Sequence, residues 1–274
     1  MHSGRSWSRI ATDCTRTATG CWALMAGEFS AELPPQQDLG PGRETVVVRF
    51  ADGRREELRL HEYDRVYAVP GLYEDVVQQQ LDCRSPDQVA GMLAAAAARI
   101  GWPADRVRVL DVGAGNGVSG EALAARGLQA LVAVDIRESA RAAALRDRPG
   151  LYADYLAADL LGDTGQDERA RQRIHQLEPN ALACVGAVGP GHLPPEALTA
   201  AANLLAPDAL VAYTRANSED DPAWAGVLDS LGTVKELDRQ RYRHRNTVNG
   251  EPIFWEARVL RLRRDGSRRA PQDH

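Results

Sequence analysis

Five short apolar runs alternate with helix-forming stretches along much of the chain, and this alternation constrains the fold more than any other feature. The runs are rich in Val, Leu and Ala, and they lie at residues 107–112, 130–136, 155–160, 181–188 and 209–214. Strands joined through helices lie parallel, and right-handed crossovers place those helices on both faces of one sheet. The pattern therefore predicts a doubly wound α/β fold.

Two further strand-like runs follow near residues 233–242 and 253–263, and the dipeptide Asn249-Gly250 lies between them. Asn-Gly is typical of a tight hairpin turn, and strands joined by so short a loop can only be antiparallel. We therefore expect the five parallel strands to be followed by a closing antiparallel pair.

The region ahead of the sheet predicts a smaller, separate unit. Residues 44–60 contain two strand-like runs around Asp52-Gly53, which predicts a hairpin. A helical stretch with several tyrosines follows, and then a helix with Ser85 as its expected N-cap and Gly101 at its end. The expected divisions are an unstructured extension at 1–42, a hairpin and helical cap at 43–103, a ligand-binding core at 104–264 and a flexible tail at 265–274.

Composition excludes several classes of protein. The net charge of −5 argues against a dedicated nucleic-acid binder, since such domains usually carry a basic excess. The 4 cysteines show no spacing typical of metal ligands, so no metal is expected, and free thiols predict a reducing cytoplasmic location. The longest uncharged run, residues 179–195, contains four prolines, so no membrane-spanning segment is expected.

The segment from Asp111 to Gly117 reads DVGAGNG, follows the first predicted strand and opens a helix. Glycines at such a turn let the backbone bend sharply and approach a ligand closely. Asp135 ends the next strand, where a carboxylate can accept both hydroxyls of a ribose. These features together predict a cofactor site.

Two classes of cofactor use this architecture. The spacing of Gly115, Gly117 and Gly120 formally matches the dinucleotide fingerprint. Asp111 opposes that interpretation, because it would lie against a pyrophosphate and its negative charge. S-adenosylmethionine (SAM) carries a positive amino group and a positive sulfonium, which a carboxylate suits. The sequence therefore favours SAM over a nicotinamide dinucleotide.

The segment VLDVGAGNG followed by AVDI resembles the class I SAM-dependent methyltransferases, over about residues 61–263. The upstream stretch from Tyr63 to Pro86 and the run CVGAVGPGHLPPEAL are similar to the Williams–Beuren-region-like subgroup. The resemblance implies a seven-stranded sheet with an antiparallel final strand. Asn116, Asn180 and the turn at 207–209 depart from the pattern, and Asn180 loosens any claim to a catalytic acid on the fourth strand.

The resemblance also implies cofactor contacts, residue by residue. The methionine end of SAM would lie against the glycine turn, the ribose at the end of the second strand, the adenine at the end of the third and the sulfonium near the end of the fourth. The residues concerned are Asp111, Gly113, Ala114, Gly115, Gly117, Asp135, Ile136, Asp159, Leu160 and Gly186. Its product would be S-adenosylhomocysteine (SAH).

Methyl transfer needs a general base only if the acceptor must lose a proton. His192 lies in the loop after the fourth strand and is the best candidate, although a surface or capping histidine explains it equally well. Tyr67 and Tyr73 could cover the substrate or simply pack their helix. Arg215 could face an acidic substrate or be exposed. His61 and His244 are weaker candidates for a base.

The favoured interpretation is a methyltransferase that acts on oxygen or nitrogen of a small molecule, with specialised metabolism as one setting. A methyltransferase for RNA or protein is the first alternative, and the arginine-rich runs at 239–245 and 258–264 motivate it. A non-catalytic SAM-binding protein is the second alternative, since no base is certain. The sequence does not determine the oligomeric state or the acceptor.

Overall fold

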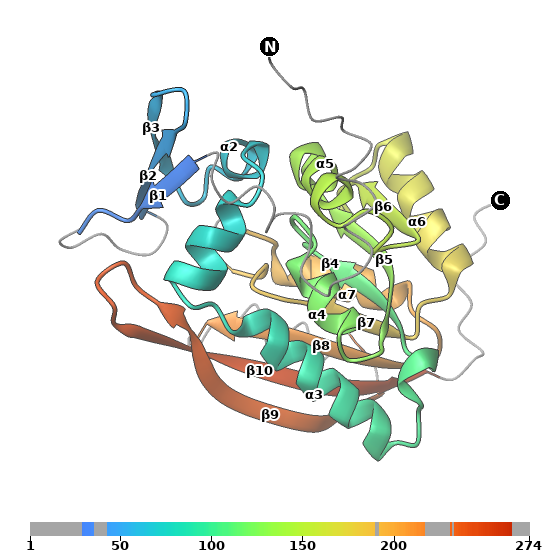
Figure 1. The fold of residues 1–274 in the computed structure, drawn as a ribbon. Coiled ribbons are helices and arrows are strands. Elements are labelled where there is room, and N and C mark those ends of the chain that lie inside the picture. The colour runs from blue at the N-terminus through green and yellow to red at the C-terminus, as the bar shows by residue number, and fades with distance from the viewer. Residues whose placement is uncertain (1–28, 36–42, 190–191, 217–230, 232, 265–274) are drawn as a thin grey trace, which may run out of the picture.

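The computed structural model describes residues 29–35, 43–189, 192–216, 231 and 233–264. Its main feature is a seven-stranded sheet (Figure 1). From one edge to the other, the strands are β6 (Asp154–Ala157), β5 (Gln129–Asp135), β4 (Arg108–Val112), β7 (Ala181–Cys184), β8 (Asp208–Ala216), β10 (Pro252–Arg263) and β9 (Thr233–Asn246). The chain reaches β4 through a short 3-10 turn, η4 (Ala104–Arg106).

Strands β4 to β8 run parallel, and β10 pairs antiparallel with both β8 and β9. The turn between β9 and β10 contains Asn249 and Gly250, as the sequence predicts. Strand β9 continues to Asn246 and is longer than its apolar pattern indicates, because both ends are held by pairing with β10. The predicted fold class, a doubly wound and mostly parallel seven-stranded sheet with an antiparallel last strand, is confirmed.

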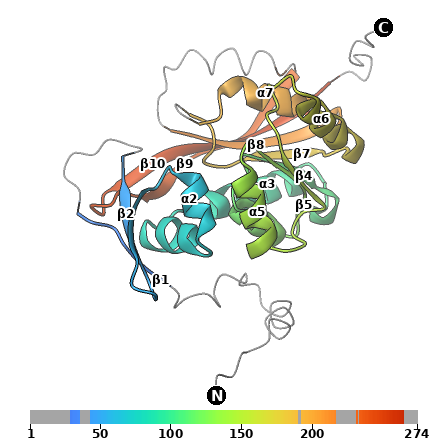
Figure 2. The same ribbon diagram turned by 90° about the horizontal axis from the view of Figure 1, so that it is seen from above.

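Helices cover both faces of this sheet (Figure 2). One face carries α3 (Ser85–Arg99), α4 (Val118–Ala124) and α5 (Glu138–Asp147), and the other carries α6 (Gly165–Leu177) and α7 (Pro195–Asn203). In β4, Leu110 and Val112 pack in the core that includes α6 and α7, whereas Val109 packs with α3 and α4. Asp111 alternates with Leu110 and Val112 and therefore faces α4, where Ser119 donates to its carboxylate.

A small antiparallel sheet lies beside the main one and consists of β1 (Phe29–Glu32), β2 (Thr45–Phe50) and β3 (Arg55–Arg59). It packs on the helical cap, which consists of α2 (Tyr63–Ala68) and the π-helix η3 (Glu74–Gln80) (Figure 1). Val46, Val48 and Leu58 form one buried cluster with Leu72 and Val76 of the cap. The predicted hairpin therefore shares a core with α2 and η3, whereas α3, the last helix of the predicted cap, packs on the main sheet.

Strand β1 lies within the stretch that we expected to be unstructured. It pairs with β2, and Phe29 and Ala31 pack against the core of the small sheet. A strand of 4 residues holds only two inward positions, which is too few for a visible alternation in the sequence. Residues 1–28 and 36–42 of the predicted extension, and the tail at 265–274, fall outside the described residues.

The start of α3 corrects one prediction. The N-cap is Arg84, and Ser85 is the first helical residue, with Pro86 directly after it. The Ser85 hydroxyl lies 2.6 Å from the hydroxyl of Tyr242 and 2.6 Å from Nδ1 of His244 in β9. The serine was expected to cap its own helix, but tertiary partners take its hydroxyl instead. Within the described part of the chain, no helix is long and apolar enough to cross a membrane.

Candidate functional site

The glycine-rich turn between β4 and α4 has a shape that larger residues could not keep. Gly113 and Gly115 have φ angles of 66° and 55°, in the left-handed region. A Cβ atom at Gly113 would lie 2.5 Å from Cβ of Ala187, and one at Gly115 would lie 2.6 Å from the hydroxyl of Tyr67. The turn therefore depends on glycine at both positions, and its backbone can approach a ligand closely.

Asp111 lies beneath this turn and is fully buried. Its Oδ2 accepts hydrogen bonds from Ser119 and Tyr152, each at 2.7 Å. Its Oδ1 is buried and has no hydrogen-bond partner among the described residues. Burial raises the pKa of Asp111 from 3.8 to about 6, although both hydrogen bonds act in the opposite direction. An unpartnered buried carboxylate oxygen is costly, so it marks a place for a positively charged group.

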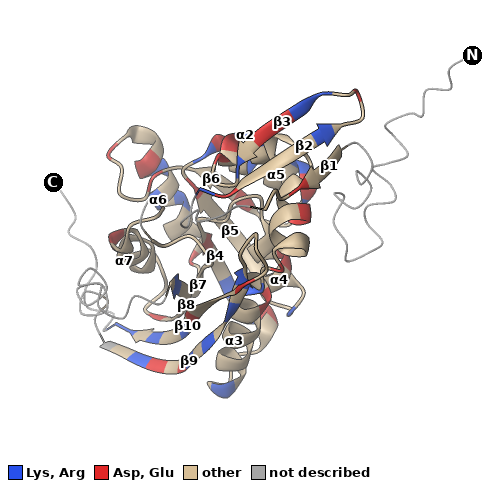
Figure 3. Ribbon diagram, turned by 90° about the vertical axis from the view of Figure 1, so that its left-hand side faces the viewer, with Lys and Arg blue, Asp and Glu red and all other residues tan. Residues whose placement is uncertain are grey.

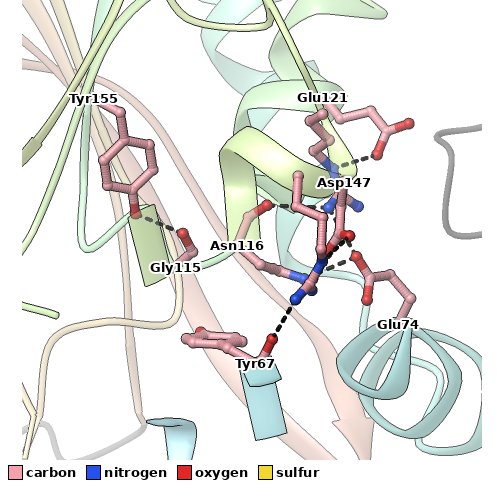
Figure 4. Close-up of polar contacts among 9 residues, drawn as sticks. Tyr67, Glu74, Gly115, Asn116, Glu121, Asp147 and Tyr155 are labelled. Atoms are coloured by element: carbon pink, nitrogen blue, oxygen red, sulfur yellow. Dashed lines mark hydrogen bonds and ion pairs between the residues drawn. The ribbon is translucent and has the colours of Figure 1, made fainter. Parts of the chain in front are cut away.

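Asp135 stands at the end of β5, next to the turn. Its Oδ2 accepts from the Gly115 N–H at 3.1 Å, and its Oδ1 accepts from the Arg137 N–H at 3.0 Å. Burial raises the pKa of Asp135, and these hydrogen bonds lower it. Tyr155 holds the same turn from the other side, since its hydroxyl donates to the Gly115 carbonyl (Figure 4). The carboxylate thus lies where the sequence predicts, at the edge of the glycine turn.

The other predicted cofactor residues also lie around the carboxyl ends of the strands. Ala114 is buried within the turn, and Gly117 directly precedes α4. Ile136 follows β5 and leaves 65% of its surface exposed. Asp159 is exposed after β6, and its neighbour Leu160 is buried.

Two details extend this picture of the strand ends. Leu161 leaves 47% of its surface exposed, so two apolar side chains, Ile136 and Leu161, face outward after neighbouring strands. Gly186 follows β7, and its N–H donates to the hydroxyl of Thr214 at 2.8 Å. No atom lies within 4 Å of the position that a Cβ at Gly186 would occupy. The edge therefore offers exposed apolar surface after β5 and β6, and open space beside Gly186.

A buried polar network connects the helical cap to the turn, and the sequence did not reveal it (Figure 4). Glu74 and Arg148 are 2% and 4% exposed, and Nη1 of Arg148 lies 2.8 Å from Oε1 of Glu74. The same oxygen accepts from the side-chain amide of Asn116 at 2.8 Å, and Arg148 also donates to the Asn116 carbonyl. Glu121 in α4 accepts from Nε of Arg148. Asn116, a departure from the subgroup's pattern, is thus a structural partner of the cap.

Aromatic rings gather beside the turn. Tyr67 is stacked on Tyr63 with ring centroids 5.6 Å apart, and it contacts Tyr73 at 5.5 Å. Tyr63 lies 5.7 Å from His61 and 6.1 Å from His192, and the two histidines are 5.2 Å apart. The structure therefore brings the predicted residues Tyr67 and Tyr73 of the helical cap near the predicted His192, which lies far away in the sequence. It adds His61, a weaker candidate, and Tyr63, which the sequence did not single out as a site residue.

The charge states of these rings follow from their surroundings. Burial raises the pKa values of Tyr67 and Tyr73 well above their ordinary value, so both phenols stay protonated. Burial and the nearby Arg137 lower the pKa of His192. Burial and the neighbouring imidazole of His192 lower the pKa of His61. Both histidines are therefore neutral near pH 7, the form in which an imidazole can take up a proton.

Arg215 does not join this group of rings by any recorded contact. It ends β8, and its Nε lies 3.0 Å from Oε1 of Glu256 in β10, with both side chains largely buried. Glu256 also accepts from Nε of Arg258, so two guanidinium groups share this carboxylate. The expectation that Arg215 faces an acidic substrate has no structural support at this position, because neighbouring strands place a carboxylate opposite it.

The arginine-rich strands are also largely neutralised, although they look basic in a charge-coloured view (Figure 3). Each of five arginines in β9 and β10 faces a carboxylate. The pairs are Arg239–Glu236, Arg243–Asp82, Arg245–Glu44, Arg258–Glu256 and Arg261–Asp208. Arg241 instead lies over the ring of Phe254, at 4.6 Å from its centroid. The alternation of arginines in the sequence thus reflects ion pairing more than a free basic surface.

The residues around the turn fit SAM. The unpartnered oxygen of Asp111 suits a cation, the glycine cradle admits a close ligand, and Asp135 offers oxygens for a ribose. Ile136 and Leu161 leave apolar surface where an adenine would lie. In the described ranges, no group of three or more His, Cys, Asp or Glu could hold a metal ion.

Local signals could have indicated some of the residues that sequence reasoning missed. Tyr63 and Tyr67 are spaced four apart in one helix, which places both rings on one face. Tyr152 precedes β6 and Tyr155 is the second residue of this strand, at the edge beside the glycine turn. Glu74 carried no such signal, because its partner Arg148 is far away in the sequence.

The chain matches no known family model, and no curated protein matches it in sequence. Several solved structures share its fold. The 1,6-didemethyltoxoflavin-N1-methyltransferase of Burkholderia thailandensis, solved with SAH, is 16% identical over 85% of this chain and 100% of its own, with a TM-score of 0.45. The ribosomal protein L11 methylase of Lactobacillus delbrueckii is 16% identical over 65% of this chain and 79% of its own, with a TM-score of 0.41.

A candidate RNA methyltransferase of Pyrococcus horikoshii is 12% identical over 68% of this chain and 87% of its own, with a TM-score of 0.46. These three proteins differ in what they are described to act on. The strand order of the main sheet itself shows a seven-stranded α/β protein, and at such low identities the similarity to these structures is one of fold alone.

Proposed function

We propose that the protein is a SAM-dependent methyltransferase and that its acceptor is a small molecule. One observation carries the proposal: a fully buried Asp111, with an unpartnered carboxylate oxygen, lies directly beneath a glycine turn. A pyrophosphate would repel this carboxylate, whereas the positive groups of SAM would be attracted to it. The combination favours SAM over a dinucleotide on electrostatic grounds.

Different residues around the turn would contact different parts of SAM. Gly113 and Gly115 would let the backbone approach the methionine end, and Asp135 would accept the ribose hydroxyls. Ile136 and Asp159 would border the adenine, and Gly186 would lie near the sulfonium. Bound SAM supplies a methyl group on a positively charged sulfur, which is already a good leaving group.

The chain's own residues would position the acceptor and exclude water. Tyr67 covers Gly115 and is 8% exposed, so it would shield the reacting groups from solvent. His192 is neutral and would accept the proton that the acceptor loses. Much of the rate would come from holding the acceptor in line with the methyl group.

The pairing of the arginines supports a small acceptor over RNA. Binding of nucleic acid needs free guanidinium or ammonium groups that can contact phosphates. In β9 and β10, Arg243, Arg245 and Arg261 instead lie 2.5 Å from carboxylates of the same chain. Contact with phosphates would require breaking these pairs.

Calorimetry with SAM and with NAD⁺ tests the cofactor. We expect SAM to bind, NAD⁺ to bind far more weakly, and Asp135→Ala to weaken SAM by about tenfold or more, since a ribose loses its acceptor. Failure of SAM to bind, or an unchanged affinity in Asp135→Ala, would refute the proposal.

A transfer assay with labelled SAM distinguishes a small-molecule methyltransferase from the two alternatives. Label in RNA or protein would indicate a macromolecular acceptor, and binding without transfer to any acceptor would indicate a non-catalytic protein.

A further inference from the structure

Three rings from two separate segments of the chain meet beside the glycine turn. His61 follows β3, Tyr63 begins α2, and His192 lies in the loop after β7. The three ring centroids are 5.2 to 6.1 Å from one another. His192 is exposed, and the other two side chains are partly exposed. We call these three residues the ring triad. It presents aromatic surface to solvent at the place where the helical cap meets the main sheet.

The ring triad adjoins Tyr67, the tyrosine that lies over Gly115 of the glycine turn. Tyr63 is stacked on Tyr67 with an interplanar angle of 24°. The Tyr67 hydroxyl in turn lies 2.6 Å from the position that a Cβ at Gly115 would take. Arg137 lies 5.7 Å from the centroid of Tyr63 and follows the carboxylate of Asp135 by two residues. A molecule held on the triad would therefore border both the turn and the end of β5.

One buried polar atom of the triad lacks a hydrogen-bond partner among the described residues. Nδ1 of His61 is buried and makes no hydrogen bond with any described residue. A buried polar nitrogen without a partner is unfavourable, and a ligand oxygen that pairs with it removes this cost. His61 faces Tyr63 and His192, and Glu44 and Arg245 lie near it as an ion pair of their own. Burial raises the pKa of Tyr63 to about 12, so its phenol stays neutral.

We propose that the ring triad is the acceptor site, and that the acceptor is a planar aromatic molecule with an ionisable hydroxyl group. The inference rests on the proposed function. The aromatic plane would lie against the rings of Tyr63 and His192. The hydroxyl oxygen is the group that matches both histidines, because it can accept a hydrogen bond from one and give its proton to the other.

The transfer step then balances. His61, with its proton on Nδ1, donates a hydrogen bond to the acceptor oxygen, and His192 accepts the proton of that hydroxyl. The oxygen forms a bond to the methyl carbon while the sulfur–methyl bond breaks and its electron pair stays on sulfur. The products are the methyl ether and SAH, and the imidazolium of His192 returns its proton to water. Arg137 lies 5.7 Å from the centroid of Tyr63, and its guanidinium is paired with Asp64 at 2.9 Å, so no charge from it is needed in this step.

Calorimetry on the SAH-loaded protein tests the site without requiring turnover. The probe is 2-naphthol, and decahydro-2-naphthol is its saturated counterpart. Three variants replace a histidine by an aromatic ring without nitrogen: His61→Phe, His192→Phe and, as the matched control on an exposed position of α6, His175→Phe. Binding of SAH to each variant verifies that it is folded.

We expect 2-naphthol to bind the SAH complex, and the saturated alcohol to bind at least about tenfold more weakly, since it cannot stack. His61→Phe and His192→Phe should each weaken 2-naphthol by about tenfold, because the ring remains but the hydrogen bond is lost. His175→Phe should bind as the natural protein does. In a transfer assay, 2-naphthol should become 2-methoxynaphthalene.

The two proposals fail in different ways. If SAH does not bind, the proposed function is wrong, and this inference falls with it. If SAH binds but 2-naphthol does not, the acceptor class is wrong while the proposed function stands. Equal affinity for the aromatic and the saturated alcohol overturns the stacking, and unchanged affinity in the two triad variants overturns the roles of His61 and His192.

Discussion

Nη1 of Arg148 lies 2.8 Å from Oε1 of Glu74, and both side chains are almost completely buried. Glu74 belongs to the π-helix of the cap, and Arg148 follows α5 on the main sheet. Through Asn116, which bonds to both residues, this ion pair reaches the glycine turn itself. The pair thus joins two separately packed units at the edge of the proposed cofactor site.

Breaking this pair should cost stability. We expect Glu74→Ala to lower the free energy of unfolding by about 3 kcal/mol, because it leaves the Arg148 charge buried with Glu121 as its remaining carboxylate. Urea denaturation measures the change. Glu168→Ala is the matched control, since its pair with Arg171 is partly exposed and should contribute less than about 1 kcal/mol. Equal effects of the two substitutions would contradict the role of the buried pair.

The shape of the glycine turn predicts a second result. Gly115→Ala should weaken SAM binding by about tenfold or more, because a Cβ meets the hydroxyl of Tyr67 and an alanine at positive φ costs about 1–2 kcal/mol. Calorimetry measures the affinity. Gly53→Ala also places alanine at a positive φ, in an open turn far from the site, and should leave the affinity unchanged.

Removing the opposing hydroxyl separates the two causes of this effect. The double variant Gly115→Ala with Tyr67→Phe loses the oxygen that a Cβ would meet, and it should recover part of the affinity. If Gly115→Ala alone binds SAM as tightly as the natural protein, the close approach at this turn is not used for binding.

The affinity for SAM should rise with pH. The pKa of Asp111 is raised in the folded protein from 3.8 to about 6, so the folded state holds this proton more tightly than the unfolded chain does. Its contribution to stability is therefore full below pH 3.8 and is lost as the pH rises through about 6. A bound cation favours the carboxylate, so binding should tighten over the same window.

Calorimetry between about pH 5 and about pH 7 measures this dependence. Asp111→Asn should reduce the slope. Burial also raises the pKa of Asp135, so adding Asp135→Asn to Asp111→Asn should remove the remaining pH dependence of SAM affinity. If SAM affinity depends on pH in both variants as it does in the natural protein, neither carboxyl interacts with the positive charge of the cofactor.

His244 should make the protein sensitive to acid. Burial lowers its pKa from 6.5 to about 3 in the folded state, where its Nδ1 meets the Ser85 hydroxyl and its ring stacks on Trp255. The unfolded chain binds this proton more readily, so the stability present above pH 6.5 is lost as the pH falls toward about 3. Chemical denaturation at several pH values should give a smaller loss for His244→Asn. The exposed His175→Asn should match the natural protein.

Patterns that act over a few residues predicted the fold well. The alternation of apolar runs and helices determines which segments become strands, and Asn249-Gly250 determines the closing hairpin. Strand β1 could not be predicted, because Phe29–Glu32 gains its stability only by pairing with β2. Ser85 was assigned to the wrong partner for the same reason, since Tyr242 and His244 approach it only in the folded chain.

In the candidate site too, residues near strand ends could be predicted, and contacts between distant segments could not. Asp111, Gly115 and Asp135 are adjacent to strand ends, so their grouping follows from the topology of a parallel sheet. The contacts of His61 with His192, and of Glu74 with Arg148, join segments that no local pattern relates. The pairing of Arg215 with Glu256 could not be predicted, because the sequence does not disclose the register of the strand that carries Glu256.

Hydrogen bonds from other parts of the protein shape the glycine turn. Asp135 and Tyr155 hold Gly115 from two sides, and Arg148 holds the carbonyl of Asn116. The turn is therefore preorganised, and a ligand that binds there does not bear the entropic cost of ordering it. The folding free energy of the chain therefore covers the ordering of this turn before a ligand binds, and this ordering should raise the affinity for the cofactor.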